Sequence, residues 1–239
     1  MNDEILHFMK KRLDKNYYEK FRFAFNSGKR VRPRLMKNIC DHLKKDFRPL
    51  LPAAAAIEVM HCMSLAHDDI VDKAVTRRDK PAFYQKYGTN SAVLFGDLFA
   101  ITAIEIFAEN YTKEIYLEFL KTFKEMVEGQ IMETENKIKD IDSYHTYAEK
   151  KTASLFVLSA KIPLIYYGIN DDKILEFTKE FGLLFQISND IAGKNDRELS
   201  ILNFISNEEA RKTINDKEHH LRKMYPKSMN DILEILDEF

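Results

Sequence analysis

The sequence predicts an all-α fold, a helical bundle that occupies residues 1–239 as a single domain. Only 7 glycines and 6 prolines stand among the 239 residues, whereas folds built from strands need both at their many turns. Apolar residues recur at helical spacing along almost the whole chain. No run of four or more residues alternates cleanly between apolar and polar side chains, as a half-buried strand would. We therefore expect about eight to ten helices joined by short connections.

Three helices are predicted before residue 75. Leu6, Met9 and Leu13 lie on one face of the first helix. Pro33 and Pro52 can each open a further helix, because proline is tolerated in the first helical turn. The helix that begins at Pro52 runs through the segment AAAAIEVMHCMSLAHDDIVD.

The middle of the chain contains three long helical patterns. Ser91–Glu109 is apolar on nearly all sides, which predicts a central, buried helix. Glu114–Ile138 and Ser143–Tyr167 are amphipathic over their whole length. Pro163 lies inside the last of these patterns and predicts a kink or an early end, because proline removes a helical hydrogen bond.

The C-terminal part adds three predicted helices. Asp171–Ile191 reads as one helix, with Asp171 or Asp172 as its N-cap, because a short carboxylate accepts from the first free backbone N–H groups. Two more helices are expected at the end of the chain, at Asn207–Met224 and Ser228–Glu238.

Composition and charge exclude several classes of protein. With 37 basic and 38 acidic residues the net charge is −1, which excludes a general nucleic-acid binder. Two cysteines, Cys40 and Cys62, allow one bridge at most and rule out a disulfide framework. The first residues carry charges and lack the apolar stretch of a secretion signal. Charged residues interrupt the apolar segments Leu50–Ala66 and Ala92–Ala108, so we expect a soluble cytoplasmic protein with reduced thiols and no stable membrane insertion.

Two aspartates lie one helical turn apart near the end of the helix that begins at Pro52. Asp68 and Asp72 are four positions apart, so their carboxylates share a face of the helix. Like charges at this spacing repel unless a cation lies between them, and magnesium prefers carboxylate oxygens together with water and substrate phosphates. The pair is therefore typical of a magnesium site, and equally of an acidic helix end on a solvated surface.

Arginines precede and follow this acidic pair in the chain. Arg77 and Arg78 come shortly after Asp72, where they either form salt bridges or hold a diphosphate, because the planar guanidinium fork matches phosphate oxygens. The segment GKRVRP, at residues 28–33, places three further cations in a turn that starts with glycine. Alone, that segment is more typical of a solvated basic loop.

Taken in order, these motifs resemble those of the trans-polyprenyl diphosphate synthases. The resemblance covers most of the chain and is closest between Gly28 and Ala100. Its segments are GKRVRP, HDDIVDKAVTRRDKP, YGTNSAVLFGDLFA, Gly129-Gln130, Lys151-Thr152-Ala153 and Phe185-Gln186-Ile187-Ser188-Asn189-Asp190. Six motifs in one order are much more specific than any one of them alone.

This resemblance implies a fold and a reaction. Members of the family fold as all-α bundles of the isoprenoid synthase type around a central active-site cavity, and they form homodimers. They join isopentenyl diphosphate to an allylic diphosphate, which extends a prenyl chain from head to tail. The allylic C–O bond ionises with the help of Mg²⁺, which stabilises the leaving diphosphate oxygens. We therefore expect Mg²⁺ as cofactor, these two diphosphates as substrates, and a homodimer.

The resemblance also assigns expected roles to residues of the first acidic motif. Asp68 and Asp72 match the magnesium ligands, with Asp69 involved less directly. Arg77 matches the residue that grips the allylic diphosphate. The expected catalytic set has six members: Asp68, Asp72, Arg77, Lys151, Thr152 and Gln186.

Substrate contacts are expected from the same comparison of motifs. Lys151, Thr152 and Gln186 match the groups that flank the allylic carbon, where a carbonyl dipole stabilises the cation. The expected isopentenyl diphosphate site consists of five residues: Lys29, Arg30, Arg32, His61 and Arg78. By itself, a lone histidine on such a helix is more often a core residue.

The second acidic motif departs from the family pattern. Family members have DDxxD after FQ, whereas this chain has Asn189-Asp190-Ile191-Ala192-Gly193. An amide replaces the first carboxylate, and glycine replaces the third. Asp190 is expected as the remaining metal ligand and Lys194 as a substrate contact. We therefore predict weak or altered metal binding at this motif, because an amide supplies an oxygen but no charge.

Product length is set in this family by residues below the first acidic motif. Met60, Met63 and Ser64 precede Asp68 on the same helix and would line the tunnel that holds the prenyl tail. A flexible methionine and a small serine favour a short-to-medium product, farnesyl or geranylgeranyl diphosphate. Ordinary core packing explains the same residues equally well.

Three other functions remain open from the sequence. The degenerate second motif would suit a catalytically weakened regulatory subunit of a heteromeric prenyl synthase. A terpene cyclase of the same fold would need no isopentenyl site, so GKRVRP and His61 speak against it. A helical scaffold without activity would leave the clustered aspartates and arginines unexplained.

Overall fold

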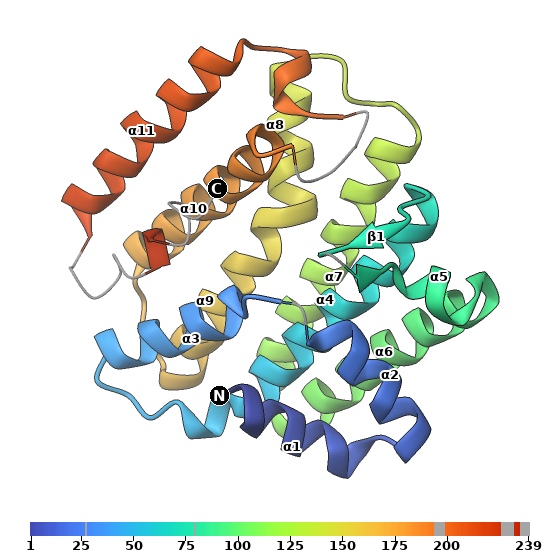
Figure 1. The fold of residues 1–239 in the computed structure, drawn as a ribbon. Coiled ribbons are helices and arrows are strands. Elements are labelled where there is room, and N and C mark those ends of the chain that lie inside the picture. The colour runs from blue at the N-terminus through green and yellow to red at the C-terminus, as the bar shows by residue number, and fades with distance from the viewer. Residues whose placement is uncertain (27, 79, 194–198, 226–231, 235–239) are drawn as a thin grey trace. The chain divides into compact units, whose positions relative to one another are not determined.

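Helices make up nearly every element of the computed structural model, which confirms the predicted all-α class (Figure 1). The structure describes residues 1–26, 28–78, 80–193, 199–225 and 232–234. Its backbone contacts divide the chain into two compact units, Met1–Pro33 with Phe47–Leu117, and Arg34–Asp46 with Glu118–Phe239. The single domain expected over residues 1–239 stays a prediction.

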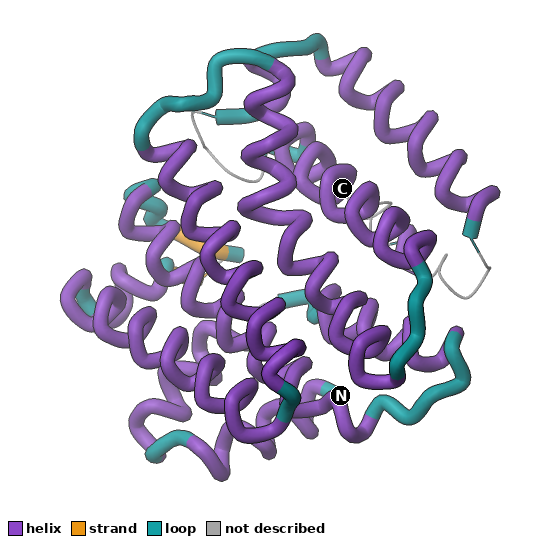
Figure 2. Tube along the Cα trace, turned by 180° about the vertical axis from the view of Figure 1, so that it is seen from behind, coloured by secondary structure: helices purple, strands orange, loops and turns teal. Residues whose placement is uncertain are grey.

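Within the described residues, the first unit contains six complete helices, parts of two more, and one short hairpin. Its complete elements are α1 (Asn2–Arg12), α2 (Lys15–Phe25), η1 (Arg48–Leu50), α4 (Leu51–Val71), β1 (Thr76–Arg77), β2 (Lys80–Pro81), α5 (Phe83–Tyr87) and α6 (Thr89–Asn110). The division between the units falls inside α3 (Val31–His42) and α7 (Lys113–Thr134). The antiparallel pair β1–β2, with Thr76 opposite Pro81, is the small strand pair seen in Figure 2.

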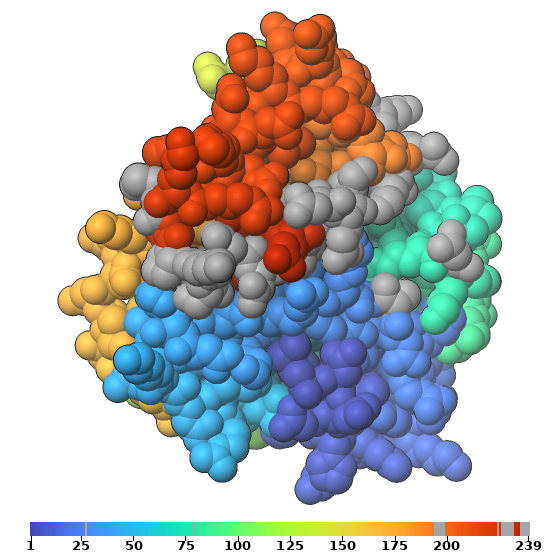
Figure 3. Space-filling view, turned by 60° about the vertical axis from the view of Figure 1, so that its left-hand side comes forward, coloured from blue at the N-terminus to red at the C-terminus, as the bar shows by residue number. Residues whose placement is uncertain are grey.

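The second unit begins with part of α3 and continues after α7 with three long helices and three shorter ones in the described part of the chain. Its elements are α8 (Ile141–Ala148), η2 (Glu149–Ala153), α9 (Ser154–Tyr167), α10 (Asp172–Ile191), η3 (Ile201–Asn203) and α11 (Asn207–Met224). Buried residues including Tyr144, Leu183 and Ile201 form its core between α8, α10 and η3. The helix α11 lies on the surface of this unit against α10 (Figure 3).

The central helix of the first unit, α4, packs against α6. Four consecutive alanines, Ala53–Ala56, are fully buried and bring the backbone of α4 close to its neighbours. A Cβ atom at Gly96 of α6 would lie 2.0 Å from Nε2 of His67, so a side chain at this position would have to displace that ring. The phenol of Tyr111 accepts from the backbone N–H of Ala53 at 2.9 Å and donates to the carbonyl of Pro49 at 3.0 Å. These contacts fix the helix that carries the first acidic motif.

The helix α6 is less buried than its apolar sequence predicts. Phe99, Ala103 and Phe107 are buried, but Leu94 is 67% exposed and Ile101 is 54% exposed. The prediction of a central, buried helix is therefore wrong for this face. Periodicity could not separate the two faces, because both are apolar.

An irregular turn interrupts the predicted helix over Ser143–Tyr167. Residues Glu149–Ala153 form a π-helical segment between α8 and α9. Two glycines allow neighbouring helices to touch its backbone: a Cβ atom at Gly129 would lie 2.7 Å from the nitrogen of Lys151, and one at Gly182 would lie 2.6 Å from Cα of Ala153. Such π segments are rare and often mark functional sites.

Of the two outcomes predicted at Pro163, a kink or an early end, the early end is wrong, and the kink stays a prediction. The helix α9 continues through Pro163 to Tyr167, and both neighbours of the proline are buried. Burial of this turn compensates for the hydrogen bond that proline removes.

Most other helix predictions hold. Asp171 is the N-cap of α10, and its carboxylate accepts from the backbone N–H of Ile174 at 3.1 Å, as predicted. The predicted helix at Glu114–Ile138 ends earlier, at Thr134. The short helix α5 and the helix α2 were not predicted. Most of the predicted helix Ser228–Glu238 lies outside the described residues.

Two described helices are long and apolar enough to cross a membrane by length and composition alone. They are Arg48–Val71 and Thr89–Asn110, and 67% of the most apolar window of the first is buried in the fold. Burial of that kind is also what a core helix of a globular protein shows. Cys40 and Cys62 are free thiols, as expected of reduced cysteines, and burial raises the pKa of each to about 12.

Candidate active site

The first acidic motif lies at the C-terminal end of α4. Asp68 and Asp69 are 7% and 2% exposed, and Asp72 is partly buried as the C-cap residue. The backbone N–H of Asp72 donates to the carbonyl of Asp68 at 2.8 Å, which places the two residues one turn apart on the helix, as predicted. Within the described part of the chain, no three His, Cys, Asp or Glu side chains form a group that could hold a metal ion by themselves.

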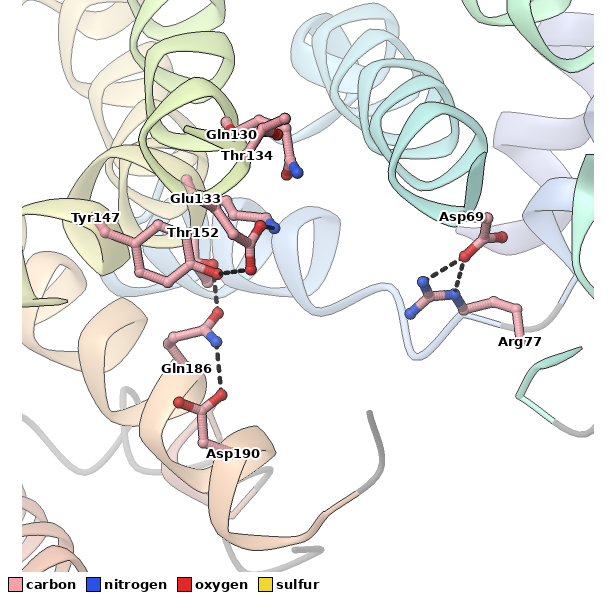
Figure 4. A network of polar contacts seen from close by, with 10 residues as sticks. Asp69, Arg77, Gln130, Glu133, Thr134, Tyr147, Thr152, Gln186 and Asp190 are labelled. Carbon is pink, nitrogen blue, oxygen red and sulfur yellow. Dashed lines mark hydrogen bonds and ion pairs between the residues drawn. The ribbon is translucent and has the colours of Figure 1, made fainter. Parts of the chain in front are cut away.

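The middle carboxylate of this motif holds an arginine. Nε of Arg77 donates to Oδ1 of Asp69 at 2.8 Å, and Nη2 of Arg77 donates to the same oxygen (Figure 4). The hairpin β1–β2 carries Arg77 to this position. Both residues line a small pocket of the first unit together with Phe23, Lys80 and Phe83. The pair therefore places a guanidinium group at the wall of a pocket, where it can meet an anion.

A second cluster of arginines surrounds one buried carboxylate in the same unit. Arg30 and Arg32 are buried, and Nη1 of Arg30 lies 3.5 Å from a carboxylate oxygen of Glu58, which is 2% exposed. Burial raises the pKa of Glu58, while the charges of Arg30, Arg32 and Arg78 act in the opposite direction. Desolvation lowers the pKa of the Arg32 guanidinium to about 10. Three arginines thus concentrate positive charge around Glu58, the one carboxylate that shifts the pKa of Arg32.

The turn GKRVRP is shaped by glycine and by a stacked arginine. A Cβ atom at Gly28 would lie 2.0 Å from Nη1 of Arg30 and 2.9 Å from Nη1 of Arg78. The guanidinium group of Arg30 lies 3.4 Å from the ring centroid of Phe25 and donates to the Phe25 carbonyl. Arg30 has a φ of 55°, a left-handed conformation that costs free energy for a residue with a side chain. This turn is built to bring two arginines together.

His61 belongs to this cluster. The charges of Arg32, Arg78, Arg30 and Arg77, together with desolvation as the largest cause, hold the pKa of His61 well below 6.5. The structure thus brings together the residues predicted for the isopentenyl diphosphate site: Arg30, Arg32, His61 and Arg78, with Lys29 exposed at the start of the turn. The imidazole is neutral near pH 7, so it can donate one hydrogen bond and accept another.

The depressed pKa of His61 predicts a pH dependence of stability. In the unfolded chain the imidazole takes up a proton below about pH 6.5, whereas the folded protein resists that proton. Stability is therefore retained above pH 6.5 and falls as the pH drops below it. Between pH 6 and pH 5 the unfolding free energy of the wild type should fall. The fall should be about 1 kcal/mol smaller in His61→Gln, which lacks the titrating imidazole.

Urea unfolding at a series of pH values measures this difference. His220→Gln, on the exposed surface of α11, is the control and should keep the pH dependence of the wild type. Parallel curves for the wild type and His61→Gln would contradict the neutral state of His61.

Glu58 is a site residue that the sequence analysis missed. It lies in a strongly apolar stretch, AAAAIEVM, where a single charge has to be paired or neutralised. That isolated charge was the available signal. Its partners lie about 26 to 28 positions earlier and 20 positions later in the chain, so no local pattern identified them.

The second unit holds a separate network around the π segment. Nζ of Lys151 donates to Glu133, and the hydroxyl of Tyr147 donates to the other Glu133 oxygen at 2.9 Å. The hydroxyl of Thr152 donates to Oε1 of Gln186 at 2.6 Å (Figure 4). Lys151, Thr152 and Gln186, predicted to act together, therefore do lie around one segment. Glu133 was not predicted, although it follows the Gly129-Gln130 motif by three positions.

The network continues into the second acidic motif. Nε2 of Gln186 donates to Oδ1 of Asp190 at 2.9 Å. Oδ2 of Asp190 accepts from the hydroxyl of Tyr144 at 2.6 Å and from the backbone N–H of Ile201 at 2.9 Å. Nδ2 of Asn189 donates to the carbonyl of Phe185 at 2.8 Å. The only carboxylate left in this motif is thus already an acceptor for three donors.

The predicted chain-length residues are placed on α4 as expected. Met60 and Met63 are buried, and Oγ of Ser64 donates to the carbonyl of His61 at 3.0 Å. Their role in setting product length stays a prediction. Lys194 lies outside the described residues.

Comparison with known proteins gives the family. The sequence model of the polyprenyl synthetase family matches residues 14–200. A short chain isoprenyl diphosphate synthase from Methanocaldococcus jannaschii is 36% identical over 187 residues, which is 74% of this chain and 57% of that protein. A geranylgeranyl diphosphate synthase from Sulfolobus acidocaldarius is 32% identical over 230 residues, 90% of this chain and 69% of that protein.

A solved structure agrees with the observed fold. An isoprenoid synthase family member from Thermotoga neapolitana superimposes with a TM-score of 0.87 at 22% identity, over 99% of this chain and 96% of that one. The chain spans between 57% and 58% of the length of the first three curated relatives that it matches. Match length, identity and fold together confirm the resemblance drawn from the motifs, and the chain belongs to the polyprenyl synthetase family.

Proposed function

We propose that this protein condenses isopentenyl diphosphate with an allylic diphosphate to give a short-to-medium prenyl diphosphate. One observation carries the proposal: the first unit contains both the paired carboxylates Asp68 and Asp72 and a cluster of arginines around the buried carboxylate of Glu58. Cations and carboxylates collected in this way match two diphosphates, one held with a metal and one by arginines. The printed names of the relatives point to the same class of reaction.

The first acidic motif fits magnesium by its chemistry. Asp68 and Asp72 offer carboxylate oxygens one turn apart, the ligands that Mg²⁺ takes when water and phosphate complete its shell. These two residues would hold the ion, which when bound supplies charge that stabilises a leaving diphosphate. Asp69 binds Arg77 instead, because its Oδ1 accepts hydrogen bonds from two N–H groups of that guanidinium.

The site residues of the first unit then have different roles in substrate binding. Asp69 holds the Arg77 guanidinium at the pocket wall, where it meets the oxygens of the allylic diphosphate. Arg30, Arg32 and Arg78, with Lys29, attract the isopentenyl diphosphate. His61 stays neutral, so it orients that diphosphate by one hydrogen bond without adding charge.

The second unit holds the three residues that match the groups flanking the allylic carbon in the family, Lys151, Thr152 and Gln186. Gln186 presents its carbonyl oxygen toward Thr152, and such an oxygen dipole stabilises an allylic cation. Lys151 is held by Glu133, with its ammonium group above the ring of Tyr147. The proton lost in the last step passes to the leaving diphosphate.

The assembly that we propose is a cytoplasmic homodimer of single-domain chains, without nucleic acid and without stable membrane insertion. The support is the exposed apolar face of α6, formed by Val93, Leu94 and Ile101. An apolar face of this kind on a helix suits an interface between protein subunits. Met60, Met63 and Ser64 are proposed to limit the prenyl tail of the product.

A second candidate function is a regulatory subunit of a heteromeric synthase. The state of the second acidic motif favours it, because Asn189 brings no charge and Asp190 is engaged by other groups. A terpene cyclase is disfavoured by the arginine cluster, which would have no second diphosphate to bind.

One assay separates these functions. The pure protein is incubated with Mg²⁺, labelled isopentenyl diphosphate and each allylic diphosphate in turn, and the products are sized. We expect incorporation by the protein alone and none after chelation with EDTA. Incorporation only after addition of a partner synthase would favour the regulatory subunit, and cyclic products formed without isopentenyl diphosphate would favour the cyclase.

A further inference from the structure

The carboxylate of Asp190 is held from three directions within the second unit. Its donors are the side chain of Gln186 on the same helix, the hydroxyl of Tyr144 on α8, and the backbone N–H of Ile201 at the start of η3. The Tyr144 side chain is fully buried, and its hydroxyl lies 2.6 Å from Oδ2 of Asp190, which accepts its hydrogen bond. Two of these donors share Oδ2, and the third meets Oδ1.

This arrangement does not fit a second metal site. A carboxylate offers about four acceptor positions, and at least three are used here by protein donors. The neighbouring Asn189 brings no charge, and Gly193 brings no side chain. A magnesium site usually has one or two carboxylates among its oxygen ligands, and the single carboxylate of this motif is already engaged.

The same contacts determine the orientation of the Gln186 amide. An ionised carboxylate only accepts hydrogen bonds, so the NH₂ end of the amide has to face Asp190. The carbonyl end then faces the opposite way and accepts from Thr152 at 2.6 Å. Without a carboxylate at position 190, an amide could turn by half a rotation and present nitrogen instead of oxygen.

We propose that Asp190 is a positioning residue that directs the carbonyl oxygen of Gln186, and that it does not bind a metal ion. Tyr144 and the Ile201 backbone hold its carboxylate in place for this task. The inference rests on the proposed function for the purpose of the Gln186 oxygen, which is to face the allylic cation. It replaces the predicted role of Asp190 as a magnesium ligand.

Metal binding tests one half of this proposal. Electron paramagnetic resonance measures free Mn²⁺ during titration of the protein in the presence of inorganic diphosphate. We expect Asp190→Asn to keep the Mn²⁺ affinity of the wild type within twofold, whereas Asp68→Ala should lose at least tenfold. A fivefold or larger loss in Asp190→Asn would overturn the proposal.

Kinetics of prenyl transfer tests the other half. Asp190→Asn should lower kcat at least tenfold and change the KM of each substrate by less than twofold. In the background of Gln186→Ala, the same change should have no further effect on kcat, because the amide on which Asp190 acts is absent. Equal losses in both backgrounds would show an independent role and overturn the proposal.

A second variant covers the case in which Asp190→Asn does not fold. Tyr144→Phe removes one donor and keeps both the ring and the carboxylate, so it should lower kcat by a smaller factor, again only while Gln186 is present. An unchanged kcat in folded Tyr144→Phe would contradict the role of Tyr144. A wild type without prenyl transfer would refute the proposed function, and the Mn²⁺ titration would still decide whether Asp190 binds metal.

Discussion

Replacing Asp68 with alanine is expected to lower kcat for prenyl transfer by at least about a hundred- to thousandfold, the range seen when a group that stabilises developing charge is removed. Asp68 is a buried carboxylate one turn from Asp72, at the end of a helix that α6 and Tyr111 hold in place. With one carboxylate left, the pair would no longer bind Mg²⁺ tightly enough to assist the leaving diphosphate. Incorporation of labelled isopentenyl diphosphate measures the loss.

A control separates this effect from a general effect of lost charge. Asp216→Ala changes an exposed aspartate of α11 and should leave kcat and KM within twofold of the wild type. Circular dichroism of both variants checks the helical content. Near-normal turnover by folded Asp68→Ala would refute the site model, whatever the behaviour of the second acidic motif.

Glu58→Ala is expected to have the largest effect on stability, a loss of about 3–5 kcal/mol in the free energy of unfolding. The carboxylate of Glu58 is 2% exposed and lies 3.5 Å from Arg30, with Arg32 buried nearby. Removal of this one partner leaves buried guanidinium groups without their counter-ion, which costs far more than the loss of a surface ion pair. Urea unfolding at pH 7 measures the change.

The matched control is an exposed ion pair in the same unit. Arg22 and Glu19 lie 2.7 Å apart on the surface of α2, so Glu19→Ala should cost at most about 1 kcal/mol. Glu58→Gln keeps the shape of the side chain and tests charge alone. If Glu58→Gln is as stable as the wild type, the buried ion pair is not what holds the arginine cluster together.

The variant Glu58→Gln also tests whether the stability of the arginine cluster affects substrate binding. Because Glu58 orders the arginines proposed to meet isopentenyl diphosphate, a folded Glu58→Gln should raise the KM for that substrate more than the KM for the allylic one. Asp69, not Glu58, holds the Arg77 guanidinium. Equal changes in both KM values would point to a general loosening of the first unit.

Local pattern was enough to predict much of the fold. The spacing of apolar residues predicted α1, α4, α10 and α11, because each of these helices buries one stripe or is buried throughout. The Asp171 cap was also predictable, since a cap depends on neighbours three residues away. The four-residue spacing of Asp68 and Asp72 placed them on one face for the same reason.

Other features were beyond local pattern. The exposed face of α6 has the same apolar character as its buried face, so periodicity predicted burial on all sides. The π segment at Glu149–Ala153 depends on backbone contacts with Gly129 and Gly182, which come from other helices. The short helix α5 and the two-residue strands are too short for a periodic pattern to show.

By itself the sequence determined the helical class, the order of the motifs and the family, because all three depend on residues close together in the chain or on their order along it. Only the tertiary structure decided which partners the charged groups have. Asp69 holds Arg77, Glu58 lies among arginines, and Asp190 accepts from Tyr144, 46 positions earlier in the chain. The physical reason is that a buried charge has to be paired, and its partner is whichever group the packing brings within reach.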